Sequence, residues 1–191
     1  NLIVSCGNCH KDASEHYANS SHSSGFKSGD TSAPTCISCH KSPITKSAFG
    51  DNKVELKIAQ EKLCLSCHLD DSDVRQRTTP SAGFIHAYDK SVHGFALHSE
   101  KNGEAASCTD CHSSHEIIKG TDSRSSVYKL NIPATCGKCH NSIEKEFNES
   151  IHGQFVKRGN NDAPTCTNCH GEHNILKTDD PDSPVAFKNV S

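Results

Sequence analysis

The sequence predicts a chain of short α-helices joined by long irregular segments, with almost no β-sheet. Leu, Ile, Val and Phe make up only 34 of the 191 residues, which is few for a conventional hydrophobic core. Ser, Gly, Asp and Pro gather between the apolar stretches and indicate turns and loops. The net charge of -3 is nevertheless small for a disordered chain, so another source of apolar surface is expected.

All twelve cysteines belong to one motif, Cys-x-x-Cys-His, which occurs six times. This motif is typical of covalent c-type haem attachment, in which the two thiols bind the haem and the histidine binds its iron. Zinc ribbons and redox Cys-x-x-Cys pairs also use paired cysteines, but neither requires a histidine after each second cysteine. Numbered 1 to 6 in chain order, the motifs are Cys6/Cys9/His10, Cys36/Cys39/His40, Cys64/Cys67/His68, Cys108/Cys111/His112, Cys136/Cys139/His140 and Cys166/Cys169/His170.

Six covalently bound haems would resolve the conflict in composition. At about 32 residues per haem, the porphyrins would supply most of the apolar surface that a core needs. The predicted fold class is therefore a multihaem cytochrome c, mostly coil with short α-helices, almost no sheet and a row of haems as its core.

The second axial ligands are expected to be histidines, because the chain contains no methionine. His115 follows His112 by three residues and is too close to reach the opposite face of the same haem. It would therefore serve a second haem packed against the first. The expected ligands outside the motifs are His93, His115 and His152 at recurring positions, then His22 and His173, and sixth His86 with His16 as its rival; His98 is interpreted as a surface residue.

The chain contains an internal repeat. Each unit has Ser-x-His on a short helix, a loop, Cys-x-x-Cys-His-x-x-His, a polar connection and a second Cys-x-x-Cys-His. The copies cover about 15–68, 86–140 and 144–191 of a single hexahaem domain. The first copy has Pro43 in place of the extra histidine, and the third is incomplete. Residues 1–10 resemble its missing end, and 127–132 match 185–190.

Local patterns predict three helices and one linker. Residues 12–25 favour a short helix capped by Asp12 or Ser14, and apolar spacing favours helices over 51–63 and 83–99. The polar stretch 70–80 is the expected linker between copies.

The incomplete third copy has three interpretations. Chains could associate head to tail, so that the end of one packs on the first haem of the next, with His173 as the candidate junction ligand. The sequence could instead be a segment of a longer repetitive cytochrome, or a monomer in which the match is accidental.

Composition also bounds the location and the partners. No stretch is apolar enough to span a bilayer, and the chain starts without a charged segment or an apolar signal core. We therefore expect a mature exported chain. Haem attachment of this type takes place outside the cytoplasm, so the expected location is extracellular or at the cell surface, with the periplasm as the alternative. No basic run suggests nucleic acid.

The pattern Ser-x-His-Gly, Cys-x-x-Cys-His-x-x-His and Cys-x-x-Cys-His resembles the multihaem c-type cytochromes of bacteria and archaea that respire minerals or exchange electrons with partners. The count of six haems is similar to that of extracellular cytochromes that polymerise into conductive filaments. The resemblance implies bis-histidine ligation, alternating stacked and T-shaped haem contacts, and subunits that can lend a histidine to a neighbour's haem. This chain is much shorter than the best-known hexahaem example.

The function expected from this resemblance is electron transfer along six bis-histidine haems, in a filament of copies joined head to tail. Redox partner proteins or extracellular acceptors would take the electrons. A discrete periplasmic carrier is the alternative. A multihaem reductase is less favoured, because such an enzyme needs an open iron face, whereas here the spare histidines exceed the irons.

Overall fold

The computed structural model describes residues 2–41, 44–78 and 83–190. The structure is about 55% helical, and the described residues contain no strand. The prediction of short helices without sheet is confirmed, whereas a core made of haem stays a prediction. No helix within the described ranges is long and apolar enough to cross a membrane.

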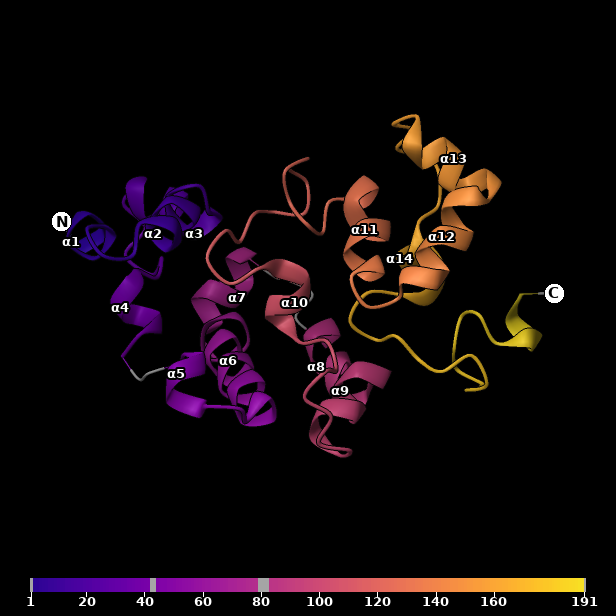
Figure 1. Ribbon diagram of the computed structural model, residues 1–191, viewed down its shortest axis with the longest axis horizontal. Helices are drawn as coiled ribbons and strands as arrows, with labels where there is room; N and C mark the ends of the chain where they lie inside the picture. The colour runs from indigo at the N-terminus through magenta and orange to yellow at the C-terminus, as the bar shows by residue number, and fades with distance from the viewer. Residues whose placement is uncertain (1, 42–43, 79–82, 191) are drawn as a thin grey trace. The chain divides into compact units, whose positions relative to one another are not determined.

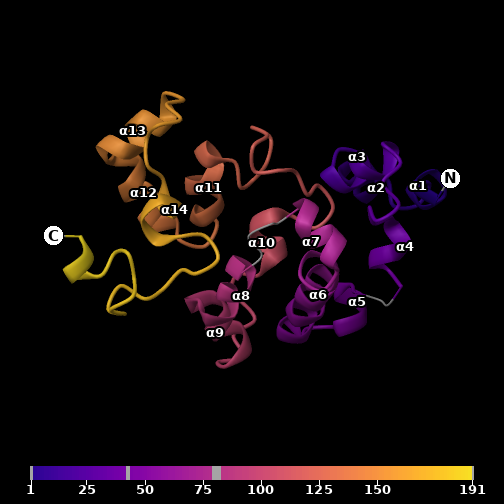
Figure 2. The same ribbon diagram turned by 180° about the vertical axis from the view of Figure 1, so that it is seen from behind.

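The chain forms two compact units, whose helices are labelled in Figures 1 and 2. Unit 1 contains Asn1–Ala82 and Leu97–Ile118, and unit 2 contains Gly83–Ala96 and Lys119–Ser191. These limits do not coincide with the three predicted repeat copies, so the limits of those copies stay a prediction.

The helices are short apart from one. Those of unit 1 are α1 (Leu2–Gly7), α2 (Lys11–Ala18), α3 (Ser21–Lys27), α4 (Cys36–Cys39), α5 (Lys46–Phe49), α6 (Lys53–His68), α7 (Ser72–Thr78) and α10 (Cys108–His112). Those of unit 2 are α8 (Gly83–Lys90), η1 (Lys129–Asn131), α11 (Ile132–Gly137), α12 (Asn141–Glu149), α13 (Ile151–Lys157), α14 (Cys166–His170) and η2 (Phe187–Asn189). Helix α9 (Val92–His98) crosses the limit between them.

Serine caps divide two of the predicted helices. The segment 12–25, in which one short helix was expected, contains two helices, because the Ser20 side chain accepts a hydrogen bond from the Ser23 amide at 3.0 Å and starts α3. Ser91 does the same for Gly94 at 3.1 Å, which divides 83–99 into α8 and α9. The predicted caps Asp12 and Ser14 are wrong, since α2 already begins at Lys11.

Two further predictions need correction. The helix predicted over 51–63 continues as α6 through the third motif to His68. The predicted linker 70–80 is mostly helix α7, because the Asp71 carboxylate accepts hydrogen bonds from two amides, those of Asp73 and Val74, both at 3.0 Å. Residues 79 and 80 lie outside the described ranges.

Helix α6 is joined to the segment 98–110 of unit 1 by a row of polar contacts. Lys57 forms an ion pair with Asp110 at 3.0 Å and donates to the Ala105 carbonyl at 2.7 Å. One turn further, Thr109 donates to the Gln60 side chain at 3.2 Å. The positions on α6 are three or four residues apart, so they share one helix face.

Each even-numbered motif begins in a helix with a capping box. The box joins the residue before the first cysteine to a side chain three residues later, so both free backbone amides find an acceptor. The pairs are Thr35 with Ser38, Ser107 with Asp110, and Thr165 with Asn168.

The matching segments near η1 and η2 have the same local structure. The Asn131 side chain donates to the carbonyls of Ser123 and Ser125, both at 2.8 Å. The Asn189 side chain donates to the carbonyls of Pro181 at 3.2 Å and Ser183 at 2.8 Å. The sequence match therefore corresponds to a repeated turn in unit 2.

The most deeply buried side chains are mainly hydroxyl groups. Leu97 is the one large apolar side chain in the group with under 2% exposure, among the residues that the structure describes. Phe26, Phe95 and Phe155 are each at least 40% exposed. The folded polypeptide therefore leaves apolar surface that a large apolar ligand could cover.

We predict that Thr165→Ala lowers the free energy of unfolding by about 1 kcal/mol, because the substitution removes a buried capping hydroxyl. Denaturant unfolding followed by circular dichroism measures the change. Thr167→Ala on the same helix is the control, and an equal loss in both variants would contradict the role of the cap.

Candidate haem sites

The six motifs are built on helical turns of two kinds. Motifs 2, 4 and 6 begin the helices α4, α10 and α14, directly after the capping boxes. Motifs 1, 3 and 5 start within the last turns of α1, α6 and α11. In either kind, cysteines three residues apart lie on one side of a helical turn, where both thiols can reach one ligand edge.

The first cysteines of the motifs meet in pairs. Side-chain hydrogen bonds join the two thiols of each pair, and the helices α1 and α4, α6 and α10, and α11 and α14 pack together. The hydrogen bond with its partner thiol lowers the pKa of Cys166 to about 7, which favours the reactive thiolate. The pairs are Cys6 with Cys36, Cys64 with Cys108, and Cys136 with Cys166.

The first cysteines of the motifs are all half-buried, whereas most of the second cysteines are exposed. Cys39 and Cys111 are half-buried, whereas the other four second cysteines are exposed: Cys9, Cys67, Cys139 and Cys169. The thiol pairs described above contain only first cysteines. Attachment of haem stays a prediction from the motif for all twelve cysteines.

A difference between the two cysteines of a motif has a geometric reason. The first thiol lies where two helices pack, as α11 and α14 do around Cys136 and Cys166. The second thiol lies one turn further along, beyond that contact. At Cys139 and Cys169 it is open to solvent, so a haem edge could approach it without displacing protein atoms.

Unit 1 also connects its two cysteine pairs. Cys39 of motif 2 lies close enough to Cys64 and Cys67 for their charges to raise its pKa, although burial is the larger cause. Motifs 1 to 4 therefore form a continuous series in unit 1, while motifs 5 and 6 are neighbours in unit 2.

Three motif histidines face a histidine from a distant part of their own unit. The ring centroids of His22 and His68 are 6.1 Å apart. The separation is 6.2 Å both for His40 with His115 and for His93 with His140.

This separation matches two imidazoles on opposite sides of one metal ion. With a metal–nitrogen bond of about 2.0–2.1 Å and ring bonds of about 1.33 Å, the two ring centroids lie about 6.3 Å apart. Stacked rings in direct contact would be closer. The three centroid separations therefore agree with two imidazoles that would bind one haem iron, and the two cysteines of the same motif would attach that haem. The planes of the paired rings are inclined by 32°, 19° and 45°.

The environment keeps several of these rings neutral. Burial lowers the pKa of His22, helped by the nearby His68, and burial also lowers the pKa of His68 itself. Burial lowers the pKa of His115 as well, with smaller contributions from His40 and His16. A neutral imidazole has the free lone pair that a metal requires.

The pairs follow the order of the motifs. His22 lies before motif 2 in the sequence but faces His68 of motif 3. His93 lies before motif 4 but faces His140 of motif 5. His115, next to motif 4, faces motif 2, so the prediction that it lies by a motif other than its own agrees with the geometry. The sequence spacing did not predict which histidine faces which motif. The Ser-x-His pattern did identify His22 and His93, the two paired histidines that lie on helices outside the motifs.

Backbone hydrogen bonds hold the two helices with paired histidines in place. The first amide of α3, from Ser21, donates to the Ile117 carbonyl at 2.8 Å. The first amide of α9, from Val92, donates to the Ile175 carbonyl at 2.9 Å. Ile117 and Ile175 each lie five residues after a motif histidine, so both helices are fixed by equivalent carbonyls.

The three imidazole pairs do not include the other predicted distal ligands. His152, His86 and His16 are exposed, and His16 lies near His115. His173 is half-buried, and burial lowers its pKa. Their roles as ligands stay predictions. Pro43, which stands where the repeat pattern would have a histidine, lies outside the described residues.

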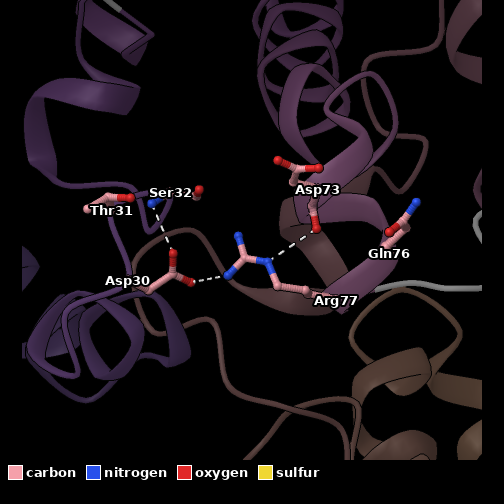
Figure 3. Close-up of a pocket in the computed structure, with 6 residues that line it drawn as sticks. All are labelled: Asp30, Thr31, Ser32, Asp73, Gln76 and Arg77. Carbon is pink, nitrogen blue, oxygen red and sulfur yellow. Dashed lines mark hydrogen bonds and ion pairs between the residues drawn. The ribbon is translucent and has the colours of Figure 1, made fainter.

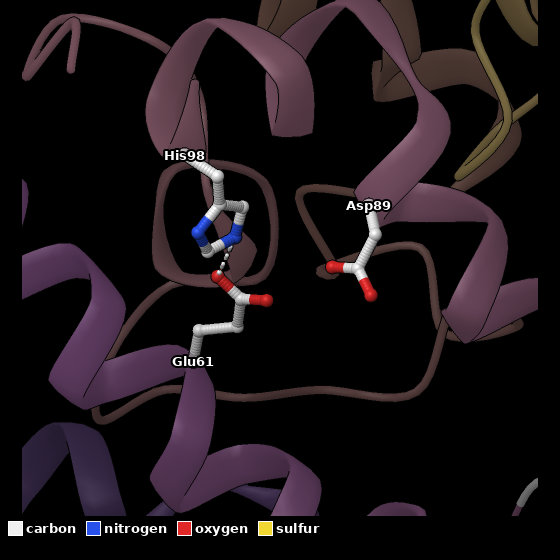
Figure 4. Close-up of side chains that lie close together, drawn as sticks. All are labelled: Glu61, Asp89 and His98. Atoms are coloured by element: carbon white, nitrogen blue, oxygen red, sulfur yellow. Dashed lines mark ion pairs between the residues drawn. The ribbon is translucent and has the colours of Figure 1, made fainter. Parts of the chain in front are cut away.

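His98 has a structural contact that the sequence did not reveal. It is half-buried and forms an ion pair at 2.9 Å with Glu61, whose side chain is buried (Figure 4). The interpretation of His98 as a plain surface residue therefore needs correction. Glu61 lies three residues before Cys64 on α6, so the pair helps to hold this helix beside the end of α9.

A polar hollow in unit 1 is lined by residues of α7 and of the turn before motif 2 (Figure 3). Arg77 on α7 forms an ion pair with Asp30 at 2.7 Å and donates to the Asp73 carbonyl at 3.2 Å. Asp30 also accepts from the Ser32 amide at 2.9 Å. These contacts fix α7 to the turn before motif 2, which is a structural role.

No protein-family model matches the chain, and no solved structure matches it. The assignment of the sites therefore depends on the motifs and on the geometry of the imidazole pairs.

In a chain loaded with haem at motif 2, we predict that His115→Ala changes this haem from low spin to high spin, because its iron would lose one of two imidazoles. Electron paramagnetic resonance of the oxidised protein measures the change. Ser114→Ala is the control on the neighbouring exposed residue and retains the ring. Unchanged low-spin signals in His115→Ala would show that His115 is not a ligand.

Proposed function

We propose that this protein transfers electrons along six covalently bound haems c, each attached at one Cys-x-x-Cys-His motif and ligated by two histidines. The observation that carries the proposal is the set of three imidazole pairs, each 6.1–6.2 Å apart and each containing a motif histidine. A disulfide or zinc protein has no need for this arrangement.

The residues of the chain would act by fixing positions. Bound haem would supply the one-electron Fe(III)/Fe(II) couple. The cysteines would hold each haem edge, and two imidazoles would occupy both iron faces, which leaves no position for a substrate and favours low potentials. The proposed activity is therefore electron transfer rather than catalysis.

The order of the motifs supports a path between the haems. In unit 1 the thiols of motifs 1 to 4 are neighbours in sequence order, and in unit 2 those of motifs 5 and 6 are neighbours. Neighbouring attachment points would bring haem edges close, as electron transfer requires. Burial and hydrogen bonds around each site would then tune the individual potentials.

We further propose that copies of the chain assemble head to tail into an extracellular filament. The resemblance to filament-forming cytochromes supports this, as do apolar side chains exposed on α12 and α13. Ile143, Ile151 and Phe155 are 58%, 61% and 40% exposed, and a second copy could cover them. A discrete periplasmic carrier is the alternative.

The first test is haem content after secretion from a host that matures c-type cytochromes. We expect a mass increase of six haems that survives denaturation, and a reduced spectrum typical of low-spin haem c. Cys36→Ser combined with Cys39→Ser is expected to retain five haems. A chain that holds zinc or disulfides and no haem would overturn the proposal.

The assembly is tested by electron microscopy of the undenatured protein. We expect long filaments with a regular axial repeat, because donor and acceptor surfaces differ and their contact does not close. Isolated small particles at all concentrations would leave the discrete carrier as the function.

A further inference from the structure

Helix α13 has the same construction as α3 and α9, the two helices whose histidines face a motif. Ser150 caps α13 by accepting from the Gly153 amide at 3.2 Å, as Ser20 and Ser91 do for their helices. His152 follows this cap by two residues, in the position of His22 and His93. A Cβ at Gly153 would clash with the Phe147 carbonyl, as one at Gly94 would with that of Tyr88.

The surroundings of α13 differ from those of the other two helices. His152 is exposed, and within the described part of the chain its ring faces no other imidazole. The first amide of α13, from Ile151, has no carbonyl acceptor comparable to Ile117 or Ile175 among the described residues. The side chain of Ile151 is also 61% exposed, whereas its counterparts Ser21 and Val92 are half-buried. The helix thus presents three unmatched features on one short segment: an imidazole, an amide and an apolar surface.

Motif 1 lacks the feature that α13 offers, which is a second imidazole. Helix histidines face motifs 3 and 5, the other odd-numbered motifs, but in the described structure no imidazole faces His10 of motif 1. His10 is presented as His140 is in motif 5. Each is the residue before a helix, with φ and ψ of -112° and 58° for His10 and -99° and 50° for His140.

We infer that His152 of one copy of the chain is the second axial ligand of the haem on motif 1 of another copy, opposite His10. The inference rests on the proposed function, because it needs a haem at motif 1. The Ile151 amide would then meet the segment that follows motif 2 of that copy.

This assignment replaces His173 with His152 as the junction ligand. It also makes the first haem site incomplete in a separated chain. The contact joins two different surfaces, so each copy offers one histidine and receives one.

The test uses the full haem-loaded chain with His152→Ala. We expect one haem in six to change from low to high spin, together with loss of association in sedimentation velocity. Added imidazole should restore the low-spin signal without restoring association. His93→Ala is the matched control, because it should produce one high-spin haem at motif 5 and leave association unchanged.

A mixture of two variants tests the two sides of the junction separately. Cys6→Ser combined with Cys9→Ser removes the acceptor haem but keeps His152, and His152→Ala keeps the acceptor. Each variant alone should stay monomeric, whereas the mixture should form dimers and lose the high-spin signal.

Wild-type protein that is monomeric and fully low-spin at every dilution would overturn the inference while leaving the proposed function intact. The same holds if His152→Ala leaves the spin states and the association unchanged. Absence of covalent haem would instead be a failure of the proposed function.

Discussion

The structure depends on holding pairs of imidazoles from distant parts of the chain at one fixed separation. The members of the pairs are 46, 75 and 47 residues apart in sequence, as counted from His22 to His68, His40 to His115 and His93 to His140. Closing such loops costs conformational entropy. Caps, short helices and backbone hydrogen bonds around the pairs restrict the freedom of each histidine in the folded chain.

Polar contacts position many of the helices in this chain, a role that apolar packing has in most other domains. Ser20, Ser91 and Thr165 are almost completely buried, and each fixes the start of a helix. Glu61 attaches the long helix α6 to His98 at the end of α9, and Lys57 attaches it to Asp110 further along the chain. A cap or an ion pair specifies direction as well as proximity, whereas an apolar contact specifies mainly proximity. Direction is the more useful property for the proposed role, in which the chain would position histidine ligands around haem.

The sequence predicted the helical, sheet-free fold because that conclusion needs only composition and turn signals. It also identified the serine–histidine pattern on both helices whose histidines form pairs. It missed the breaks at Ser20 and Ser91, because apolar spacing continues across a cap whereas the backbone does not. It also missed α7, whose start depends on the single side chain of Asp71. The sequence did not predict the partner of each histidine, because the pairing depends on tertiary contacts such as the hydrogen bond from the Ser21 amide to the Ile117 carbonyl.

His22 and His93 each face the second motif that follows them in the sequence, not the first. This rule restricts how such a chain can change in length. Insertion or loss of a single motif would present a helix histidine to a motif of the wrong kind, one that begins a helix instead of ending one. Insertion or loss of two adjacent motifs with their connecting helix would preserve every pairing. Chains built on this plan can therefore be lengthened or shortened in steps of two motifs, which keeps their number even.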